Sequence, residues 1–251
     1  MSALRDTATI FIRESQPVWR APASMAFNLV QPLVFLGMFG PLLSGIPGLP
    51  GASPWQWFVP GIVIMLCLFG PANAGYTLLM EMQTGAHERL LVTPMNRSAM
   101  LVGRALKEIA PLLAQSALII GVTMPFGFGL HLGGALAGLA VLSVLGVGLA
   151  ALSYALAIAV RKQDWMFWAV QQTLLFPLVI LSGMLLPLGM GPTWMQTAGR
   201  INPLTAVVDA ERALFAGNVT TAAVLQGAVA AVMVAIAGLA LGTRAMRRST
   251  V

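Results

Sequence analysis

Long apolar stretches separated by short polar segments form the dominant pattern of this sequence. They cover six ranges: 21–43, 57–80, 105–126, 134–160, 165–186 and 222–243. A helix needs about 20 residues to cross the hydrocarbon core of a bilayer, and backbone groups in lipid must hydrogen-bond within their own segment. The pattern therefore predicts an all-α, polytopic membrane protein with six transmembrane helices, which together form a single domain over residues 1–251.

The segment before the first stretch has helical periodicity. Over residues 1–20, charged and polar side chains share one face, and apolar side chains share the other: Leu4, Ala8, Phe11 and Ile12. Such an amphipathic segment lies in the interface between lipid and water. We therefore expect an interfacial helix on the membrane surface before the first span.

Two further segments do not fit a simple pattern of spans and turns. Residues 81–104 are rich in charge and contain an apolar pair, Leu90 and Leu91, followed by Pro94. This predicts a cytoplasmic loop with a short amphipathic helix that is suited to docking another protein. Residues 187–221 are too long for a turn and moderately apolar, which predicts an outer re-entrant helical hairpin between spans five and six, with Trp194 among the lipid headgroups.

The distribution of basic residues predicts the orientation. Only 9% of the residues are charged, against about 25% in soluble domains. If the first residue is cytoplasmic, the outer segments hold only Arg200 and Arg212, and twelve of the 14 Lys and Arg lie inside: Arg5, Arg13, Arg20, Arg89, Arg97, Arg104, Lys107, Arg161, Lys162, Arg244, Arg247 and Arg248. Because cytoplasmic loops are rich in Lys and Arg, we expect both termini on the cytoplasmic side of the membrane.

The chemistry of the polar residues excludes several functions. The net charge of +6 lies in short clusters between spans, which favours topology over nucleic-acid binding. No GxxxxGK[ST], HExxH, CxxC or GxSxG motif occurs. Cys67, the single cysteine, lies in an apolar run and is expected to be a small buried side chain. We therefore expect no catalytic site, metal or cofactor on this chain.

The positions of the acids bear on the energy source. No Asp or Glu lies in the middle of a predicted span, and Asp209 and Glu211 fall in the outer segment. Carriers coupled to protons or sodium commonly place acids inside the bundle. The pattern therefore places the energy source on another chain. An autonomous secondary carrier or channel stays open as the alternative, whereas a lipid-modifying enzyme would need an acid, base or metal cluster.

Amide side chains interrupt the predicted spans. Such groups hydrogen-bond between helices in membranes, so they either join helices or line a cavity or dimer seam between spans one, two and five. The residues in question are Asn28, Gln31, Asn73, Gln171 and Gln172.

Two motifs resemble those of a known family. Residues 81–94 read E-x-x-x-G-x-x-E-x-L-L-V-T-P. This is similar to the cytoplasmic coupling loop of type 2 ATP-binding-cassette (ABC-2) exporter permeases, nearest to the daunorubicin-resistance permease group. The following SAMLVGRALKE resembles that family's entry into span three. LSGMLLPL at 181–188 and INPLTAVVDAERALFAG at 201–217 resemble its outer hairpin.

The resemblance implies a half-transporter. Two permeases, identical or paralogous, would pair in the membrane among its lipids and bind two copies of a cytosolic ABC ATPase subunit, which holds the ATP and Mg. It assigns coupling to the ATPase to a set in the charged loop: Glu81, Gly85, His87, Glu88, Arg89, Leu91 and Pro94. Its outer-hairpin positions are Asn202, Pro203 and Asp209.

The first outer loop sets an expectation for the cargo. Residues 44–56 are short and rich in Gly and Pro, and they leave no room for an extracellular substrate-handling domain. Cargo would therefore enter from the cytosol or the inner leaflet, which favours export of an amphiphilic small molecule, drug or lipid-like product. A precursor of the cell wall or of a polysaccharide stays open as another cargo.

Overall fold

The computed structural model describes residues 3–20, 22–44, 53–85 and 97–248, and helices account for most of these ranges. Within them, five helices are long and apolar enough to cross a membrane, and a further apolar helical stretch, Leu29–Leu42, is shorter. The predicted all-α, polytopic membrane fold is therefore confirmed.

The long helices lie within or around the predicted apolar stretches. They are α2 (Pro22–Ser44), α3 (Pro54–Gln83), α6 (Ile109–Thr123), α7 (Leu132–Ala159), α8 (Asp164–Leu181) and α11 (Ala222–Arg248). The shorter helices are α1 (Ala3–Arg20), α5 (Arg97–Lys107), α9 (Thr193–Ile201) and α10 (Pro203–Phe215), with 3-10 turns η1 (Met124–Phe126) and η2 (Leu188–Met190). Because α5 leads directly into α6, the third apolar span extends over Ser98–Phe126.

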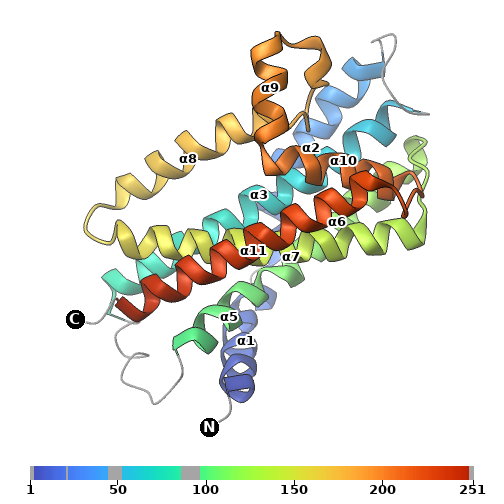
Figure 1. The fold of residues 1–251 in the computed structure, drawn as a ribbon. Helices are drawn as coiled ribbons and strands as arrows, with labels where there is room; N and C mark the ends of the chain where they lie inside the picture. Colours follow the sequence, from blue (N-terminus) through green and yellow to red (C-terminus); the bar gives the residue numbers. More distant parts are fainter. Residues whose placement is uncertain (1–2, 21, 45–52, 86–96, 249–251) are drawn as a thin grey trace.

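Helices α3, α7 and α11 run side by side through the centre of the bundle (Figure 1). Small residues allow the close approach of α7 and α11, since a Cβ on Gly238 would collide with the carbonyl oxygen of Gly148. Between α3 and α7, the backbone N–H of Gly75 donates to Ser153 Oγ at 2.9 Å. Close packing of small residues and buried hydrogen bonds are what hold helices together in lipid.

Different helices lie at the two ends of the bundle. Helices α1 and α5 and the last turns of α11 lie at one end, and α9 and α10 lie at the other (Figure 1). Helix α8 diverges from the central helices (Figure 1). Only 22% of its 18 residues are buried inside the protein. The apolar side chains that α8 exposes include Trp165, Leu174, Phe176 and Ile180.

One side of α1 packs against α5. Asp6 and Ile10 of α1 are buried, whereas Ala8 and Ile12, which belong to the predicted apolar face, are exposed. The Cβ position of Gly103 in α5 lies 2.8 Å from the carbonyl oxygen of Thr7, so only a glycine permits this approach. Helix α1 is therefore packed on α5 through a side that carries both the polar Asp6 and the apolar Ile10, and its place at the membrane surface stays a prediction.

Helix α10 is an integral part of the bundle. It packs against α3, α7 and α11, and its side chains join the main apolar core: Leu204, Val207, Val208 and Phe215. The backbone of α10 approaches α11 at Gly227, where a Cβ would collide with Ala210. With 13 residues, α10 is too short to cross a bilayer, so its re-entrant path through the outer leaflet stays a prediction.

Candidate coupling site and interhelical pocket

A cluster of four charged side chains joins α1, α3 and α5. Arg104 Nη2 on α5 lies 3.3 Å from Glu14 Oε1 on α1 and 2.5 Å from Glu81 Oε2 on α3. Lys107 Nζ lies 3.1 Å from the other Glu14 oxygen, Oε2. The guanidinium side chain of Arg104 is 1% exposed. A single arginine on α5 therefore ties α1 to the end of α3.

The backbone beneath this cluster is also anchored. Tyr154 of α7, which is 1% exposed, donates its hydroxyl proton to the carbonyl oxygen of Arg104 at 3.3 Å. Because α7 belongs to the centre of the bundle, this hydrogen bond joins α5 to the long helices.

The charges of the cluster affect the titration of Glu14. Burial opposes ionisation of this carboxyl, but the positive charges of Arg104 and Lys107 outweigh it and lower the pKa of Glu14 below its usual value. The carboxylate therefore stays ionised at neutral pH. An ionised pair held in low dielectric is strongly coupled, so loss of one partner leaves a buried charge without compensation.

Glu81 and Gly85 are the two predicted coupling residues within the described ranges. Glu81 belongs to the charged cluster, and Gly85 follows α3 with φ 71°, a left-handed conformation that favours glycine. The other five predicted coupling residues lie outside the described residues: His87, Glu88, Arg89, Leu91 and Pro94. The structure thus places the charged cluster directly at the start of the predicted coupling loop.

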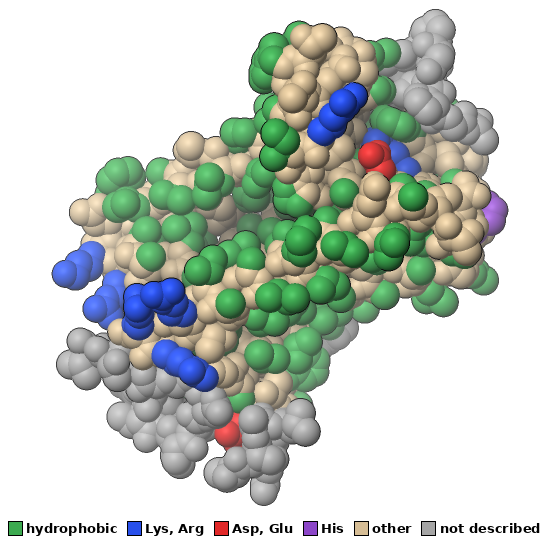
Figure 2. Space-filling view, in the orientation of Figure 1, with side chains coloured by type: hydrophobic (Ala, Val, Ile, Leu, Met, Phe, Trp, Pro, Cys, Tyr) green, Lys and Arg blue, Asp and Glu red, His purple; other side chains and the backbone are tan. Residues whose placement is uncertain are grey.

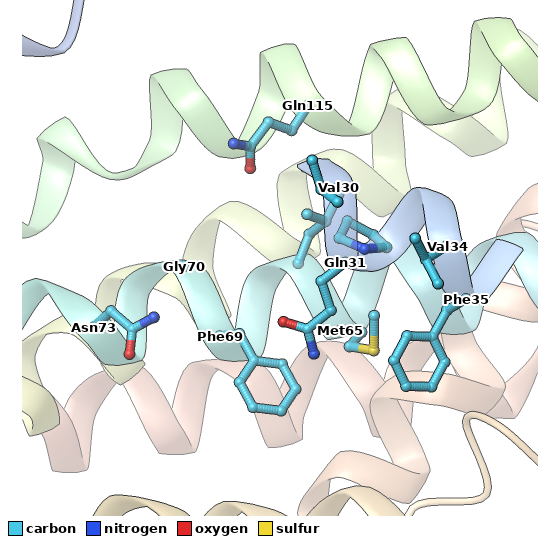
Figure 3. Close-up of a pocket in the computed structure, with 11 residues that line it drawn as sticks. Val30, Gln31, Val34, Phe35, Met65, Phe69, Gly70, Asn73 and Gln115 are labelled. Atoms are coloured by element: carbon cyan, nitrogen blue, oxygen red, sulfur yellow. The ribbon is translucent and has the colours of Figure 1, made fainter. Parts of the chain in front are cut away.

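A pocket of about 460 Å³ lies between α2, α3 and α6 (Figure 3). Its polar lining consists of three amides, one from each helix: Gln31, Asn73 and Gln115. The remaining wall is mostly apolar: Val30, Pro32, Val34, Phe35, Met65, Leu66 and Phe69. Such a mixture, an apolar surface with a few polar groups, is typical of a small-molecule site.

The amides predicted to share a cavity or seam are only partly together. Gln31 and Asn73 line this pocket, and Gln171 of α8 donates its Nε2 proton to Asn73 Oδ1 at 2.8 Å. The Oε1 atom of Gln172 is buried without a hydrogen-bond partner among the described residues. The side chain of Asn28 lies outside the described residues.

Helix α8 meets α3 through aromatic rings as well as through the amide pair. The ring of Tyr76 on α3 lies 5.1 Å from that of Trp168 and 6.1 Å from that of Phe167, both on α8. Aromatic pairs at these separations stabilise packing beyond the area that they bury. These ring contacts and the amide pair join α8 to α3.

The predicted outer-hairpin residues organise the start of α10. Asn202 caps this helix by accepting the backbone N–H of Leu204 at 3.0 Å. Its side-chain amide also donates to the carbonyl oxygen of Leu178 at the end of α8, at 2.8 Å. Pro203 occupies the first turn, where its missing N–H has no cost, and Asp209 is exposed. The hairpin is therefore linked to α8.

Arg212 connects α10 to the outer end of α3. Its guanidinium carbon lies 3.3 Å from the ring centroid of Trp57, and Nη2 donates to the carbonyl oxygen of Gly183 at 2.8 Å. Burial lowers the pKa of Arg212 to about 10, which leaves it positively charged at neutral pH. The cation–π contact and the hydrogen bond hold the outer ends of α3, α8 and α10 together.

The neighbouring Glu211 points the other way, into the bundle. It is 0% exposed, and neither carboxyl oxygen has a hydrogen-bond partner among the described residues. It packs against Gly138 of α7, where a Cβ would collide with the carboxyl group. Burial raises the pKa of Glu211 to about 8. The carboxyl group is thus kept predominantly protonated at neutral pH.

Sequence reasoning missed several members of these sites. It treated Arg104 and Lys107 as topology determinants, placed Glu14 on the polar face of a surface helix, and did not assign Gln115 to a cavity. The sequence did contain one signal for Glu211. Glu211 and Arg212 are neighbours in a moderately apolar helix, and adjacent side chains point about 100° apart, so the helix cannot expose both equally.

Comparison with known proteins supports the same assignment. The model of the family described as ABC-2 type transporter matches residues 5–216, so the chain belongs to that family. "Putative transport permease ycf38" of Pyropia yezoensis is 27% identical over 220 residues, which cover 85% of this chain and 75% of that protein. The protein of the same name from Cyanophora paradoxa is 28% identical over 207 residues, which cover 78% of this chain and 69% of that protein.

A further relative carries a more specific name. "Daunorubicin resistance ABC transporter permease protein DrrB1" of Streptomyces coeruleorubidus is 23% identical over 210 residues, which cover 80% of this chain and 74% of that protein. The resemblance that was based on residues 81–94 and 181–217 is therefore confirmed at the level of the family. The chain is a multi-pass membrane protein and a transporter permease.

Proposed function

We propose that this chain is the membrane subunit of an ABC exporter, which moves an amphiphilic small molecule, drug or lipid-like product out of the cytosol or the inner leaflet. Two permeases, identical or paralogous, pair in the inner membrane of a bacterial cell. Two cytosolic ATPase subunits hold ATP and Mg and supply the energy. Both termini face the cytosol, in agreement with the excess of Lys and Arg on that side.

The charged junction of α1, α3 and α5 is the observation that carries this proposal. It lies where α3 ends and the predicted coupling loop begins, and Arg104 connects all three helices. A movement of an ATPase subunit against this loop reaches α1 through Glu14 and α3 through Glu81. Because the ion pairs are buried, they resist separation and act as a stiff joint between loop and bundle.

The pocket between α2, α3 and α6 supports an amphiphilic cargo. Its wall is mostly apolar, and three amides offer both donors and acceptors without a fixed charge. The name of the Streptomyces relative refers to resistance to daunorubicin, a drug. An amphiphile of that general kind would place its apolar part against Phe35 and Phe69 and its polar groups near Asn73.

The proposal is tested by reconstituting the permease with a candidate ATPase subunit in lipid nanodiscs. We expect the permease to bind the subunit and to change its ATP turnover, and we expect Glu88→Ala and Gly85→Pro in the loop to reduce either effect. The exposed outer residue Arg200 is a matched control, since Arg200→Gln should behave as wild type. Failure of every candidate ATPase to bind would contradict the proposal.

One observation favours a second candidate, the autonomous secondary carrier. Glu211 is a buried carboxyl group without a hydrogen-bond partner among the described residues, and acids of this kind serve as proton sites in coupled carriers. A transport assay in proteoliposomes that contain the permease alone distinguishes the autonomous carrier from the exporter. Transport of daunorubicin driven by a pH gradient without any ATPase, and abolished by Glu211→Gln, would favour the carrier over the exporter.

A further inference from the structure

Basic side chains gather at the end of the bundle where α11 terminates (Figure 2). Two adjacent hollows follow the last turns of this helix. The first, of about 270 Å³, lies between α7 and α11 and is lined by Ala155, Ile158, Ala159, Arg161, Ala245 and Arg248. The second, of about 630 Å³, is lined by Leu239, Ala240, Thr243, Arg244, Arg247 and Arg248. Arg248 lines both hollows, which are together called the groove below.

The groove has an apolar floor and a basic mouth. Alanines and Ile158 form the part nearest the middle of the helices, because small side chains leave room between the close-packed α7 and α11. Arg161, Arg244 and Arg248 stand at the mouth and are exposed. Within the described ranges, none of these three has a carboxylate within 4.0 Å, since the ion pairs there involve Arg104, Lys107 and Arg212.

We infer that this groove binds an anionic glycerophospholipid, with the headgroup phosphate between Arg161 and Arg248 and an acyl chain along Ala155, Ile158 and Ala159. Guanidinium groups match phosphate oxygens in a bidentate geometry. Basic pockets between transmembrane helices at the cytoplasmic side are suited to anionic headgroups. The groove combines apolar side chains with exposed arginines, which suits an amphiphilic occupant better than a soluble anion.

The position of the groove connects it to the packing of α11 against α5. Arg247, from the same turn of α11, donates its Nη2 proton to Ser98 Oγ of α5 at 3.2 Å. The groove therefore adjoins the contact between α11 and the helix that carries the charged junction. The inference requires only that the chain lies in a membrane. It does not depend on the identity of the cargo or on the proposed ATPase.

The test compares phosphatidylglycerol with phosphatidylcholine on the purified full-length chain. Thermal unfolding is followed in detergent with either lipid added, and retained lipid is counted by native mass spectrometry. The variant Arg161→Gln/Arg248→Gln removes two charges from the groove. The control Arg13→Gln/Arg200→Gln removes two charges from exposed positions elsewhere. The contribution of an ATPase is tested separately, as binding of the candidate subunit to each variant in phosphatidylcholine nanodiscs.

We expect phosphatidylglycerol, but not phosphatidylcholine, to raise the unfolding midpoint of wild type and control by several degrees. The groove variant should lose at least half of this shift and retain less phosphatidylglycerol. Equal shifts with both lipids, or an undiminished shift in the groove variant, would overturn the inference. A groove variant that responds normally to phosphatidylglycerol but no longer binds the ATPase would assign these arginines to protein docking instead.

Discussion

Arg104 of α5 contacts Glu81 of α3 at 2.5 Å between Nη2 and Oε2, across 23 residues that include the predicted coupling loop. The two ends of this loop are therefore joined by a charge pair at its base. The same guanidinium reaches Glu14, so α1 is joined to both ends of the loop.

Replacement of Arg104 should be among the most destabilising single changes at this end of the bundle. Arg104→Gln leaves Glu14 and Glu81 without their shared partner in a buried site, which costs about 3–5 kcal/mol of stability. The loss is measured as a lower unfolding midpoint in detergent.

Arg104→Lys is the informative companion to that variant. It retains the positive charge but has one ammonium group in place of the planar guanidinium that reaches two carboxylates. We expect a midpoint between those of wild type and Arg104→Gln. If Arg104→Gln unfolds at the wild-type temperature, the junction contributes no stability and cannot act as a stiff joint.

The protonation of Glu211 predicts that stability depends on pH. Its pKa of about 8 in the folded state lies above the usual carboxyl value, so the folded state binds the extra proton. The contribution of Glu211 to stability is therefore greatest below the usual carboxyl pKa. It falls as the pH rises towards 8, by at most about 1.4 kcal/mol per pH unit. Glu211→Gln should remove this slope. A slope that is identical in both proteins would show that Glu211 is not responsible.

Glu14 makes stability depend on pH in the opposite direction. Its pKa is lowered in the folded state, so the ionised form contributes stability above the usual carboxyl pKa and that contribution is lost as the pH falls through the lowered value. We expect Glu14→Gln to reduce acid sensitivity in unfolding experiments below about pH 4. Since Glu211 acts at higher pH, the two variants should alter separate parts of one pH profile.

The close approach of α7 and α11 predicts that they do not tolerate an added methyl group. Gly238→Ala would place a Cβ against the carbonyl oxygen of Gly148, and relieving this overlap costs about 1–3 kcal/mol. Gly121→Ala is the matched control, because no heavy atom lies within 4 Å of its Cβ position. A Gly238→Ala protein as stable as the control would contradict the packing described here.

The amide pair between α3 and α8 is suited to a double-mutant cycle. Asn73→Ala and Gln171→Ala remove the two partners of the 2.8 Å hydrogen bond. Hydrogen bonds between membrane helices contribute about 0.6 kcal/mol on average and at most about 1.7 kcal/mol, so the coupling energy should fall in this range. A parallel cycle with Gln172→Ala, which lacks this partner, should give no coupling.

The helices were predictable because lipid imposes a length and a polarity on each of them. The apolar stretches 134–160 and 222–243 correspond to α7 and α11, since almost any run of this kind must form a helix in a bilayer. The helical form of α1 was predictable from its periodicity, and its position at the membrane surface stays a prediction. Its contact with α5 was not predictable, because periodicity within one helix does not reveal which distant helix packs against it.

The site was less predictable than the fold for a similar reason. Glu14, Glu81 and Arg104 are far apart in the sequence, and no local spacing connects them. Glu81 was assigned to coupling through the resemblance to a family, whereas Arg104 was counted only as a positive charge on the inner side. Gln115 lines the pocket because α6 packs against α2 and α3. Hydropathy along the chain does not reveal which helices pack together.

The most direct test of coupling through the charged junction measures a distance in the assembled complex. Spin labels are placed at two exposed positions, Gln16→Cys on α1 and Ala216→Cys after α10, in a Cys67→Ala background. With the ATPase subunit bound, we predict that trapping with ATP and vanadate shifts the distance between the labels in wild type and in Arg200→Gln, but not in Arg104→Gln. A shift in Arg104→Gln equal to that of wild type would contradict the account.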